Sequence, residues 1–414
     1  MRSENRAPAG ANHWPRTAGY FALFVKLGLV TSALGPTLPA LAGQAGVDLD
    51  QASILFTAHA LGYLLGALLG GRLYDLMGGH PVQAAGLALM ALSIGLVPLV
   101  PSLWPLAVLW LLVGLAGGAL DVGGNTLMVW VHGREVGPYM NGLHFFFGVG
   151  SALGPLVVAL MLALGTSAAR AYWPLALLLL PVAAWLLRLA SPAAPDDEEP
   201  APTGGVPSAM SDAAAEPSKA GVLAGVPAGV IVALIAVLLL LYVGAEASFG
   251  GWIYSYAVAL ELGSAEGAAY LASAFWGALT AGRLLAIPVA ARYRPRSILL
   301  VDLLGCLLSV AVILLWSGSA VALWAGTLGL GASMASIFPT AITLAERRLR
   351  ITGRITGWFL AGSSVGAMSL PWIIGQLFTT VGPTATMSVI LFDLAAALGI
   401  FAVLMWASRV PQPA

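Results

Sequence analysis

The sequence predicts an all-α membrane protein with 12 transmembrane helices, arranged as two six-helix pseudo-symmetric bundles. Hydrophobic residues make up 59% of the 414 residues and charged residues only 9%, whereas a soluble domain carries about 25% charged residues. The mean hydropathy is +0.91. The apolar residues also gather in runs that reach the length of about 20 residues that a helix needs to cross a bilayer.

Short polar connections separate the apolar runs, with one long exception. The segment 191–222 is rich in Pro, Ala and acidic residues and predicts a disordered cytoplasmic linker, because such a composition cannot bury a core. It divides an N-terminal six-helix bundle, 17–190, from a C-terminal one, 223–408, with cytoplasmic tails at 1–16 and 409–414. The predicted spans are 17–43, 51–76, 81–101, 103–132, 137–165, 171–190, 223–258, 266–291, 297–317, 319–348, 353–380 and 384–408.

The basic residues predict how these spans are oriented. With both termini in the cytoplasm, the 18 Lys and Arg residues fall in cytoplasmic segments or at helix ends facing them, except Arg170 in an outer loop and Lys26 within a span. Cytoplasmic loops of membrane proteins are enriched in Lys and Arg. We therefore expect a multi-pass plasma-membrane protein, and the low Lys and high Ala and Gly content favours a bacterial inner membrane.

The composition also excludes several classes of function. A net charge of zero gives no electrostatic footprint for nucleic acid, and the single cysteine, Cys306, excludes an internal disulfide. The sequence shows no nucleophile–base pair, metal-ligand cluster or Gly-rich nucleotide loop, so we expect neither an enzyme nor a metal or cofactor. The sequence contains no soluble signalling domain, so it does not favour a sensor function.

The two halves of the chain carry a related motif at the same place. GALLGGRLYD, at 66–75, ends the second predicted span, and GALTAGRLLA, at 277–286, ends the eighth; six of the ten positions match without a gap. Such a repeat predicts a duplicated six-helix unit in which both halves have the same orientation. In such transporters a site is expected between the halves near the midplane.

The stretch GLAGGALDVGGN, from Gly114 to Asn125, places a carboxylate near the middle of a predicted span. A charge at that depth costs at least about 2.5–3.5 kcal/mol on insertion scales. At helical spacing, one stripe holds Gly114, Gly117 or Gly118, Asp121 and Asn125. Glycines in membranes usually serve close helix packing, but the addition of Asp121 and Asn125 favours an open polar stripe that binds a solute or couples a proton.

The segment from Gly71 to Gly78, GRLYDLMG, resembles the signature of the major facilitator superfamily in the loop after helix 2. His80 stands where that family has a basic residue. Together with the six-plus-six organisation, the resemblance implies the major facilitator fold and a conformational latch made of Gly71, Asp75, Gly78 and Arg134. Asp75 would bind the N-terminus of helix 11 or pair with Arg134, although a solvated helix cap would explain it equally well.

Further segments narrow this resemblance. The helices around 117–125 and 242–256 are similar to helices 4 and 7 of the fucose–proton symporter family, and 141–155 together with 275–283 resembles the sodium-dependent glucose transporter branch. The fucose symporters have a second carboxylate in helix 1, where this chain has Gly35. Their two-carboxylate proton scheme therefore cannot be carried over.

Charged residues within the spans are candidates for coupling transport to an ion. Lys26 and Asp121 lie at similar depths in helices that line the cavity of this superfamily, which predicts an ion pair between them. A fixed structural pair, or Lys26 reaching toward the membrane edge, would be the alternative. Glu246 has no basic residue nearby in its own half, so we expect it to face the cavity and bind sugar hydroxyls, sodium or a proton. A protonated acid that caps a kink is its alternative.

Other polar and aromatic side chains are candidates for substrate binding. Asn125, Asn141 and His144 could bind hydroxyl groups, although a lone histidine between helices is more often structural. Trp252 and Trp276 could stack on a sugar ring, although aromatic belts explain most such residues.

Three remaining features have local interpretations. The segment 150–155 partly resembles the antiporter signature of helix 5, and we interpret it mainly as a kink and a close-packing seam. Asp302 is predicted to pair with Arg296. Asp393, half-way along the last span, has no assigned role.

These features predict a secondary active transporter for a small polar solute, a sugar, which works by alternating access and uses H⁺ or Na⁺ as the coupling ion. An efflux antiporter for drugs or metabolites, or a transporter of lipid-type substrates, is the alternative. We expect a monomer in the lipid bilayer.

Overall fold

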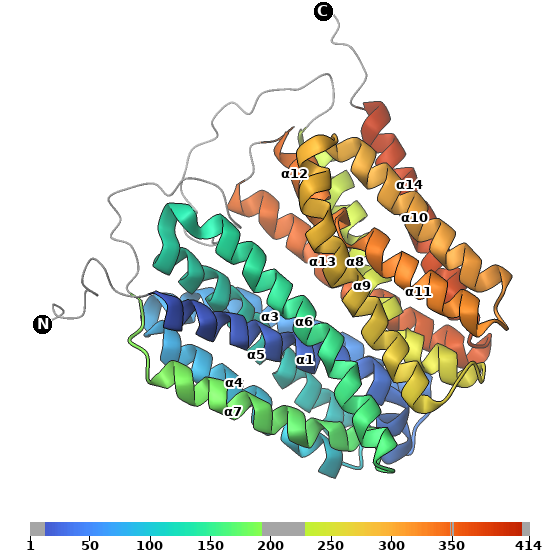
Figure 1. The fold of residues 1–414 in the computed structure, drawn as a ribbon, viewed down its shortest axis with the longest axis horizontal. Coiled ribbons are helices and arrows are strands. Elements are labelled where there is room, and N and C mark those ends of the chain that lie inside the picture. The colour runs from blue at the N-terminus through green and yellow to red at the C-terminus, as the bar shows by residue number, and fades with distance from the viewer. Residues whose placement is uncertain (1–12, 193–227, 348, 350–351, 408–414) are drawn as a thin grey trace, which may run out of the picture. The chain divides into compact units, whose positions relative to one another are not determined.

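The computed structural model describes residues 13–192, 228–347, 349 and 352–407. Within this part the chain is helical and contains no strand. Figure 1 shows the helices coloured along the chain. They are α1 Trp14–Ala45, α2 Leu49–Ala52, α3 Ile54–Leu76, α4 Gly79–Leu96, η1 Val97–Leu99, α5 Leu103–His132, η2 Gly133–Glu135, α6 Val136–Ala163, η3 Ala168–Ala171, α7 Tyr172–Leu187, α8 Ala228–Ala259, α9 Ala265–Arg292, α10 Pro295–Leu315, α11 Ala320–Met334, α12 Ile337–Glu346, α13 Gly353–Thr380 and α14 Ala385–Ala407.

Twelve stretches of the described helices are long and apolar enough to cross a membrane, which confirms the predicted fold class. The span bounds agree with the prediction within a few residues; the fourth, Leu103–His132, agrees at both ends. Two spans are assembled from two α-helices each, and two more add a short 3₁₀ helix, η1 or η3, to one α-helix. Leu49–Tyr74 joins α2 to α3, and Ala320–Glu346 joins α11 to α12.

The chain divides into two compact units that do not coincide with its two halves. One unit holds Met1–Ala33, Ala40–Val47 and Ala58–Ser208, and the other holds Leu34–Pro39, Asp48–Thr57 and Ala209–Ala414. The second unit therefore includes part of α1, all of α2 and the first residues of α3. The predicted tails and most of the linker at 191–222 lie outside the described residues.

Glycines bring the same pairs of helices together in both units. In the first unit, a Cβ on Gly150 of α6 would lie 2.0 Å from the Val25 oxygen of α1, and one on Gly118 of α5 would lie 2.0 Å from the Tyr63 oxygen of α3. No side chain fits at such distances, so the backbones themselves are in contact. The first and fifth spans, and the second and fourth, are thereby packed together.

The second unit repeats this arrangement. A Cβ on Gly366 of α13 would lie 2.0 Å from the Leu240 oxygen of α8, and one on Gly331 of α11 would lie 2.5 Å from the Phe275 oxygen of α9. These contacts join the seventh span to the eleventh and the eighth to the tenth. In addition, α4 packs against α7 in the first unit as α10 packs against α14 in the second. The duplication read from the sequence is therefore present in the packing.

Candidate functional site

The glycines that precede Asp121 in α5 serve helix packing. A Cβ on Gly114 would lie 2.0 Å from the backbone oxygen of His59, and Gly118 has the same relation to Tyr63. The expectation of an open stripe along these glycines is therefore wrong, because α3 covers that stripe at backbone contact. The close approach has a consequence for the site: it places the Tyr63 side chain beside Asp121.

Asp121 is bound by two hydrogen-bond donors. The Tyr63 hydroxyl donates to Asp121 Oδ2, and Asn125 Nδ2 donates to Oδ1 at 3.1 Å and to the Asp121 carbonyl at 2.8 Å. Two buried polar atoms nearby have no hydrogen-bond partner in the described part of the chain, Asn125 Oδ1 and the Tyr74 hydroxyl. The Tyr74 hydroxyl packs against α5 two residues from Asp121, since a Cβ on Gly123 would lie 2.0 Å from it.

Lys26 does not pair with Asp121. Among the described residues no ion pair joins them, and the Lys26 side chain is half-buried. The predicted ion pair is therefore wrong for this conformation: Tyr63 and Asn125 supply the hydrogen bonds that the prediction gave to Lys26. Similar depth in the membrane is not sufficient to predict an ion pair, because the sequence does not show which faces of α1 and α5 meet.

Glu246 of α8 is likewise bound by a tyrosine. The Tyr242 hydroxyl, one helical turn earlier, donates to Glu246 Oε2 and also lies 3.1 Å from the carbonyl oxygen of Met334. Tyr242 is fully buried, whereas Glu246 is half-buried. No ion pair reaches Glu246 from any described residue.

Met334 is the last residue of α11, where the tenth span is broken. Ala335 and Ser336 separate α11 from α12, and the Ser336 hydroxyl donates to Asp302 Oδ2 of α10. The predicted Asp302–Arg296 pair is wrong, since no ion pair joins these two described residues. The break is therefore held by Tyr242 on one side and by Asp302 on the other.

A family model described as Major Facilitator Superfamily matches residues 20–371 of the chain. The chain belongs to this superfamily. It is a transporter and not an enzyme. Two relatives extend the comparison: sodium-dependent glucose transporter 1A of Mus musculus is 30% identical over 394 residues, 86% of this chain and 88% of the relative, and sodium-dependent glucose transporter 1 of Danio rerio is 29% identical over 402 residues, 88% of this chain.

The chain spans 64% of the length of the Danio rerio protein. The resemblance to the sodium-dependent glucose transporter branch is confirmed by these relatives. Among solved structures, a mutant of the nucleoside transporter NupG is similar, with a TM-score of 0.73, 13% sequence identity, and coverage of 95% of this chain and 100% of that one. At this identity the likeness concerns the fold alone.

The superfamily's signature region lies partly outside the described residues. The side chains of Asp75 and Arg134 are not among those described, so the predicted latch stays a prediction. Gly78 caps the N-terminus of α4, and a Cβ on Gly71 would meet open space. A side chain at either position would cause no steric clash, so packing does not explain why the signature has glycine there.

His80, which replaces the basic residue of the superfamily signature, is fully buried. Its Nε2 lies 2.8 Å from the Tyr20 hydroxyl and its Nδ1 2.9 Å from the Leu189 carbonyl. The carbonyl can only accept, so Nδ1 carries the hydrogen and Nε2 accepts from Tyr20. The backbone N–H of His80 donates to Ser191 Oγ at 2.9 Å. His80 therefore ties the end of the first bundle's last helix to α1 and α4.

The other predicted substrate-binding residues take no part in the hydrogen bonds of Asp121 and Glu246 described above. Asn141 and His144 are exposed on α6, and the His144 ring packs edge-on against Phe24. Trp276 is half-buried, and its Nε1 has no partner within the described part. Whether these three bind substrate stays a prediction.

Trp252 offers no ring face to a solute in this conformation. Its side chain is fully buried between Phe56 and Phe378, and its Nε1 donates to the Pro371 carbonyl at 2.9 Å. The expectation of a stacking platform is therefore corrected to that of a packed core residue. Its position in the last third of α8 is compatible with both roles.

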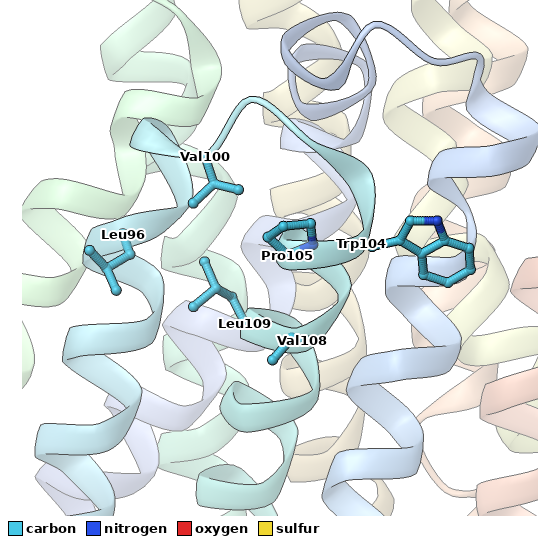
Figure 2. Close-up of a pocket in the computed structure, with 6 residues that line it drawn as sticks. All are labelled: Leu96, Val100, Trp104, Pro105, Val108 and Leu109. Atoms are coloured by element: carbon cyan, nitrogen blue, oxygen red, sulfur yellow. The ribbon is translucent and has the colours of Figure 1, made fainter.

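The cavity between the C-terminal end of α4 and the N-terminal end of α5, about 530 Å³, is a different kind of site. Figure 2 shows its lining residues, which are Leu96, Val100, Trp104, Pro105, Val108 and Leu109. The lining has no charged side chain, and Asp121 and Glu246 are not part of it. Its apolar lining differs from the polar atoms that surround Asp121 and Glu246.

Sequence reasoning missed the tyrosine at the Asp121 site. Tyr63 follows Gly62 on the face of α3 that meets α5, and a Cβ on Gly62 would lie 2.0 Å from the Leu111 oxygen. The spacing of Gly62, Gly66 and Gly70 could have identified the packed face and, with it, Tyr63 as a neighbour of α5. Asp393 is buried on α14, and its Oδ2 has no partner in the described part.

Proposed function

We propose that this chain transports a small sugar across the membrane by alternating access and that a proton or sodium gradient drives the transport. The family assigns a transporter, and the similarity to proteins named sodium-dependent glucose transporters extends over nearly the whole chain. The names of these relatives support a sugar as the substrate. They support a gradient-driven process as well, and the identity of the ion is decided by the experiment below.

The observation that carries the proposal is the group of polar atoms around Asp121. A sugar hydroxyl both donates and accepts hydrogen bonds. The carboxylate and the unpaired Asn125 Oδ1 can accept, and the unpaired Tyr74 hydroxyl can donate. A buried polar group without a partner costs about 1–3 kcal/mol, so a hydroxylated solute that satisfies these atoms would gain affinity that an apolar solute would not.

The feature that favoured efflux has a packing explanation. The two glycines of the partial antiporter signature both face α1: a Cβ on Gly150 would lie 2.0 Å from the Val25 oxygen, and one on Gly154 would lie 2.2 Å from Ser32 Oγ. These contacts support the interpretation of the segment as a close-packing seam. It no longer favours efflux over uptake of a hydrophilic solute.

The orientation and assembly form part of the same proposal. We place both termini in the cytoplasm of a plasma membrane because the basic residues segregate to that side. A single chain carries both six-helix units, so the functional unit proposed here is a monomer. No cofactor takes part other than H⁺ or Na⁺ as the coupling ion.

Uptake of labelled glucose and fucose into proteoliposomes tests this function. The purified full chain is reconstituted, and a pH gradient and a sodium gradient are imposed in turn. We expect uphill uptake of one sugar under one gradient. In Asp121→Asn we expect this uptake to be lost, because the neutral amide replaces a carboxylate oxygen by a donor. Asp48→Asn, which changes an exposed acid in the connection before α2, is the matched control and should transport normally.

Absence of uptake under both gradients would overturn the sugar assignment and bring efflux or lipid transport to the front. Uptake that survives in Asp121→Asn would contradict the role given to Asp121. Both results would leave the membership of the superfamily intact.

A further inference from the structure

The Tyr242 hydroxyl lies between two acceptors and has one hydrogen. Its oxygen is within hydrogen-bond distance of Glu246 Oε2 and, at 3.1 Å, of the Met334 carbonyl. A carboxylate and a carbonyl can only accept, and a phenol donates once. With Glu246 ionised, one of the two acceptors is therefore left without a donor.

Two of these three oxygens belong to fully buried residues, Tyr242 and Met334, whereas Glu246 is half-buried and forms no ion pair with any described residue. Arg283 of α9 and Cys306 of α10 act on Tyr242 electrostatically from nearby elements without forming an ion pair. The helices that pack against α8 are α9, α12, α13 and α14, and the other charged or titratable side chains described on them are Glu266, Tyr270, Arg292, Glu346 and Asp393.

We propose that Glu246 holds the proton that is carried across the membrane, and that Tyr242 links this proton to the break in the tenth span. A proton that binds the carboxylate forms one O–H bond on Glu246. That hydroxyl donates to Tyr242 Oη, and the phenol, which keeps its own hydrogen, turns to donate to the Met334 carbonyl. All three oxygens are then satisfied in one chain. A sodium ion would need about six oxygen ligands, by analogy with other hard cations.

At Asp121, in contrast to Glu246, the hydrogen-bond donors match the carboxylate oxygens in number. Its carboxylate receives one hydrogen from Tyr63 and another from Asn125, at separate oxygens. Each of these two carboxylate oxygens therefore already has a donor, whereas the group around Tyr242 is one hydrogen short. We assign the proton to Glu246 on this count, and Asp121 is left to bind the solute. This assignment rests on the proposed transport function only in that the proton is carried; the binding of the proton itself does not depend on a sugar.

The proton has a mechanical consequence at the helix break. Met334 is the last residue of α11, and its carbonyl is one of the groups that a broken helix leaves without an intrahelical partner. When Glu246 loses its proton, the hydrogen of Tyr242 is drawn to the carboxylate, and the Met334 carbonyl loses its donor. The Ser336–Asp302 hydrogen bond on the other side of the break remains. Protonation therefore changes one of the two side-chain anchors of the junction between α11 and α12.

Infrared difference spectroscopy tests the proton site without any sugar. The reconstituted full chain is titrated from alkaline to acid pH in potassium buffer, and the C=O stretching region of neutral carboxylic acids is recorded. We expect a band from a weakly hydrated acid that is lost in Glu246→Gln and kept in Glu261→Gln, an exposed residue in the turn after α8. In Tyr242→Phe the band should shift, because the acid loses its acceptor.

A measurement on the unmodified chain guards against variants that do not fold. In wild-type protein labelled with ¹³C at the glutamate carboxyl, the band should move to lower frequency, whereas a band from an aspartic acid would not move. A band that persists in Glu246→Gln, or that does not move with the label, would overturn the assignment. A band that disappears when sodium replaces potassium at constant pH would give the site to sodium and also overturn it.

Transport separates this inference from the proposed function. If the infrared band is assigned to Glu246 but no sugar is taken up, the substrate assignment fails and the proton site stands. If a pH gradient drives uphill sugar uptake equally well in wild type and in Glu246→Gln, the proposed function stands and the proton site is refuted.

Discussion

Asp121 and Glu246 are each bound by a tyrosine hydroxyl and not by a basic side chain. An ion pair inside a membrane neutralises a carboxylate but leaves few of its hydrogen-bonding positions free for a ligand. A phenol supplies one hydrogen bond and leaves the remaining lone pairs of the carboxylate available. Tyrosine thus stabilises a half-buried acid while the acid stays able to bind a solute or a proton.

Replacing Tyr63 by phenylalanine should weaken transport without affecting the fold. The ring that packs near Gly117 is retained, and only the hydrogen bond to Asp121 is lost. Hydrogen bonds to charged groups contribute about 1.5–3 kcal/mol, so we expect the ratio of maximal uptake rate to KM to fall by roughly tenfold to a hundredfold. Initial-rate uptake in proteoliposomes measures this ratio.

Tyr293→Phe is the matched control for this variant. Tyr293 is exposed after the end of α9, and the change should leave uptake at the wild-type level. If Tyr63→Phe also transports like wild type, the hydroxyl does not contribute to the function of Asp121.

At the residue scale, the sequence could identify the acids but not what binds them. Asp121 and Glu246 stand out because a charge in an apolar run is costly. Their partners depend on which helix faces meet: Tyr63 reaches Asp121 because glycines on α3 and α5 let the two backbones touch. Lys26, chosen for its depth and charge, lies on a helix that packs against both α5 and the glycines of α6, but its side chain does not pair with Asp121. For Glu246 the partner lies on the same helix, so its spacing of four residues was informative.

The glycine contacts between helices are the main packing device of both units. The pairs α1–α6 and α3–α5 in one unit correspond to α8–α13 and α9–α11 in the other. Without a hydrophobic driving force between helices in lipid, close van der Waals contact of small residues stabilises such pairs. The duplicated pattern means that a change at one glycine should destabilise its own unit first.

A single methyl group on Gly118 should be poorly tolerated. The Cβ of Gly118→Ala would lie 2.0 Å from the Tyr63 carbonyl oxygen, which is backbone and cannot rotate away. Overpacking costs about 1–3 kcal/mol, so we expect a lower unfolding temperature in detergent, measured by thermal denaturation. The displaced α3 should also weaken uptake, since Tyr63 moves with it.

Gly399→Ala provides the comparison, because a Cβ at Gly399 of α14 meets open space. Alanine is favoured over glycine in helices by up to about 1 kcal/mol, so this variant should unfold at the same or a higher temperature. Equal stability of the two alanine variants would contradict the packing role of Gly118.

At the scale of elements, apolar length predicted the helices but not the break within the tenth span. The break at Ala335–Ser336 precedes Pro339 by a turn. Proline lacks an N–H for the carbonyl four residues earlier, here that of Ala335, and its ring crowds the same group. Pro36, Pro39 and Pro155 nevertheless lie inside continuous helices. The neighbouring side chains decide the outcome, and these were not visible in the sequence.

At the scale of the whole molecule, the boundary between the two compact units does not follow the chain. The linker in the sequence predicted a division into consecutive halves, but Asp48–Thr57 belongs to the second unit. There Gln376 Nε2 donates to the Asp50 carbonyl at 2.9 Å, and Thr57 Oγ1 donates to the Met368 carbonyl at 3.0 Å. These side chain to backbone contacts join residues 326 and 311 positions apart in the sequence, and no local pattern indicates them.

This attachment can be measured with one introduced cysteine. Ser53 is fully buried, and the native Cys306 is buried as well, so Ser53→Cys reports on the exposure of 48–57 in the full chain. Adding Gln376→Ala removes the hydrogen bond to Asp50. At about 1 kcal/mol for such a bond, the population in which the introduced thiol is accessible should rise roughly fivefold. The rate of labelling by a water-soluble maleimide should rise with it.

Gln51→Ala is the control on the same short helix, because Gln51 is exposed. It should leave the labelling rate of the Ser53→Cys reporter unchanged. The reporter in an otherwise wild-type chain should react slowly, since the Gly375 backbone packs on residue 53 so closely that a Cβ there would lie 2.4 Å from that of Ser53. Fast labelling before any change at Gln376 would mean that 48–57 is not held by the second unit in the membrane. Residues 48–57 would then belong with the N-terminal residues that flank them in the sequence.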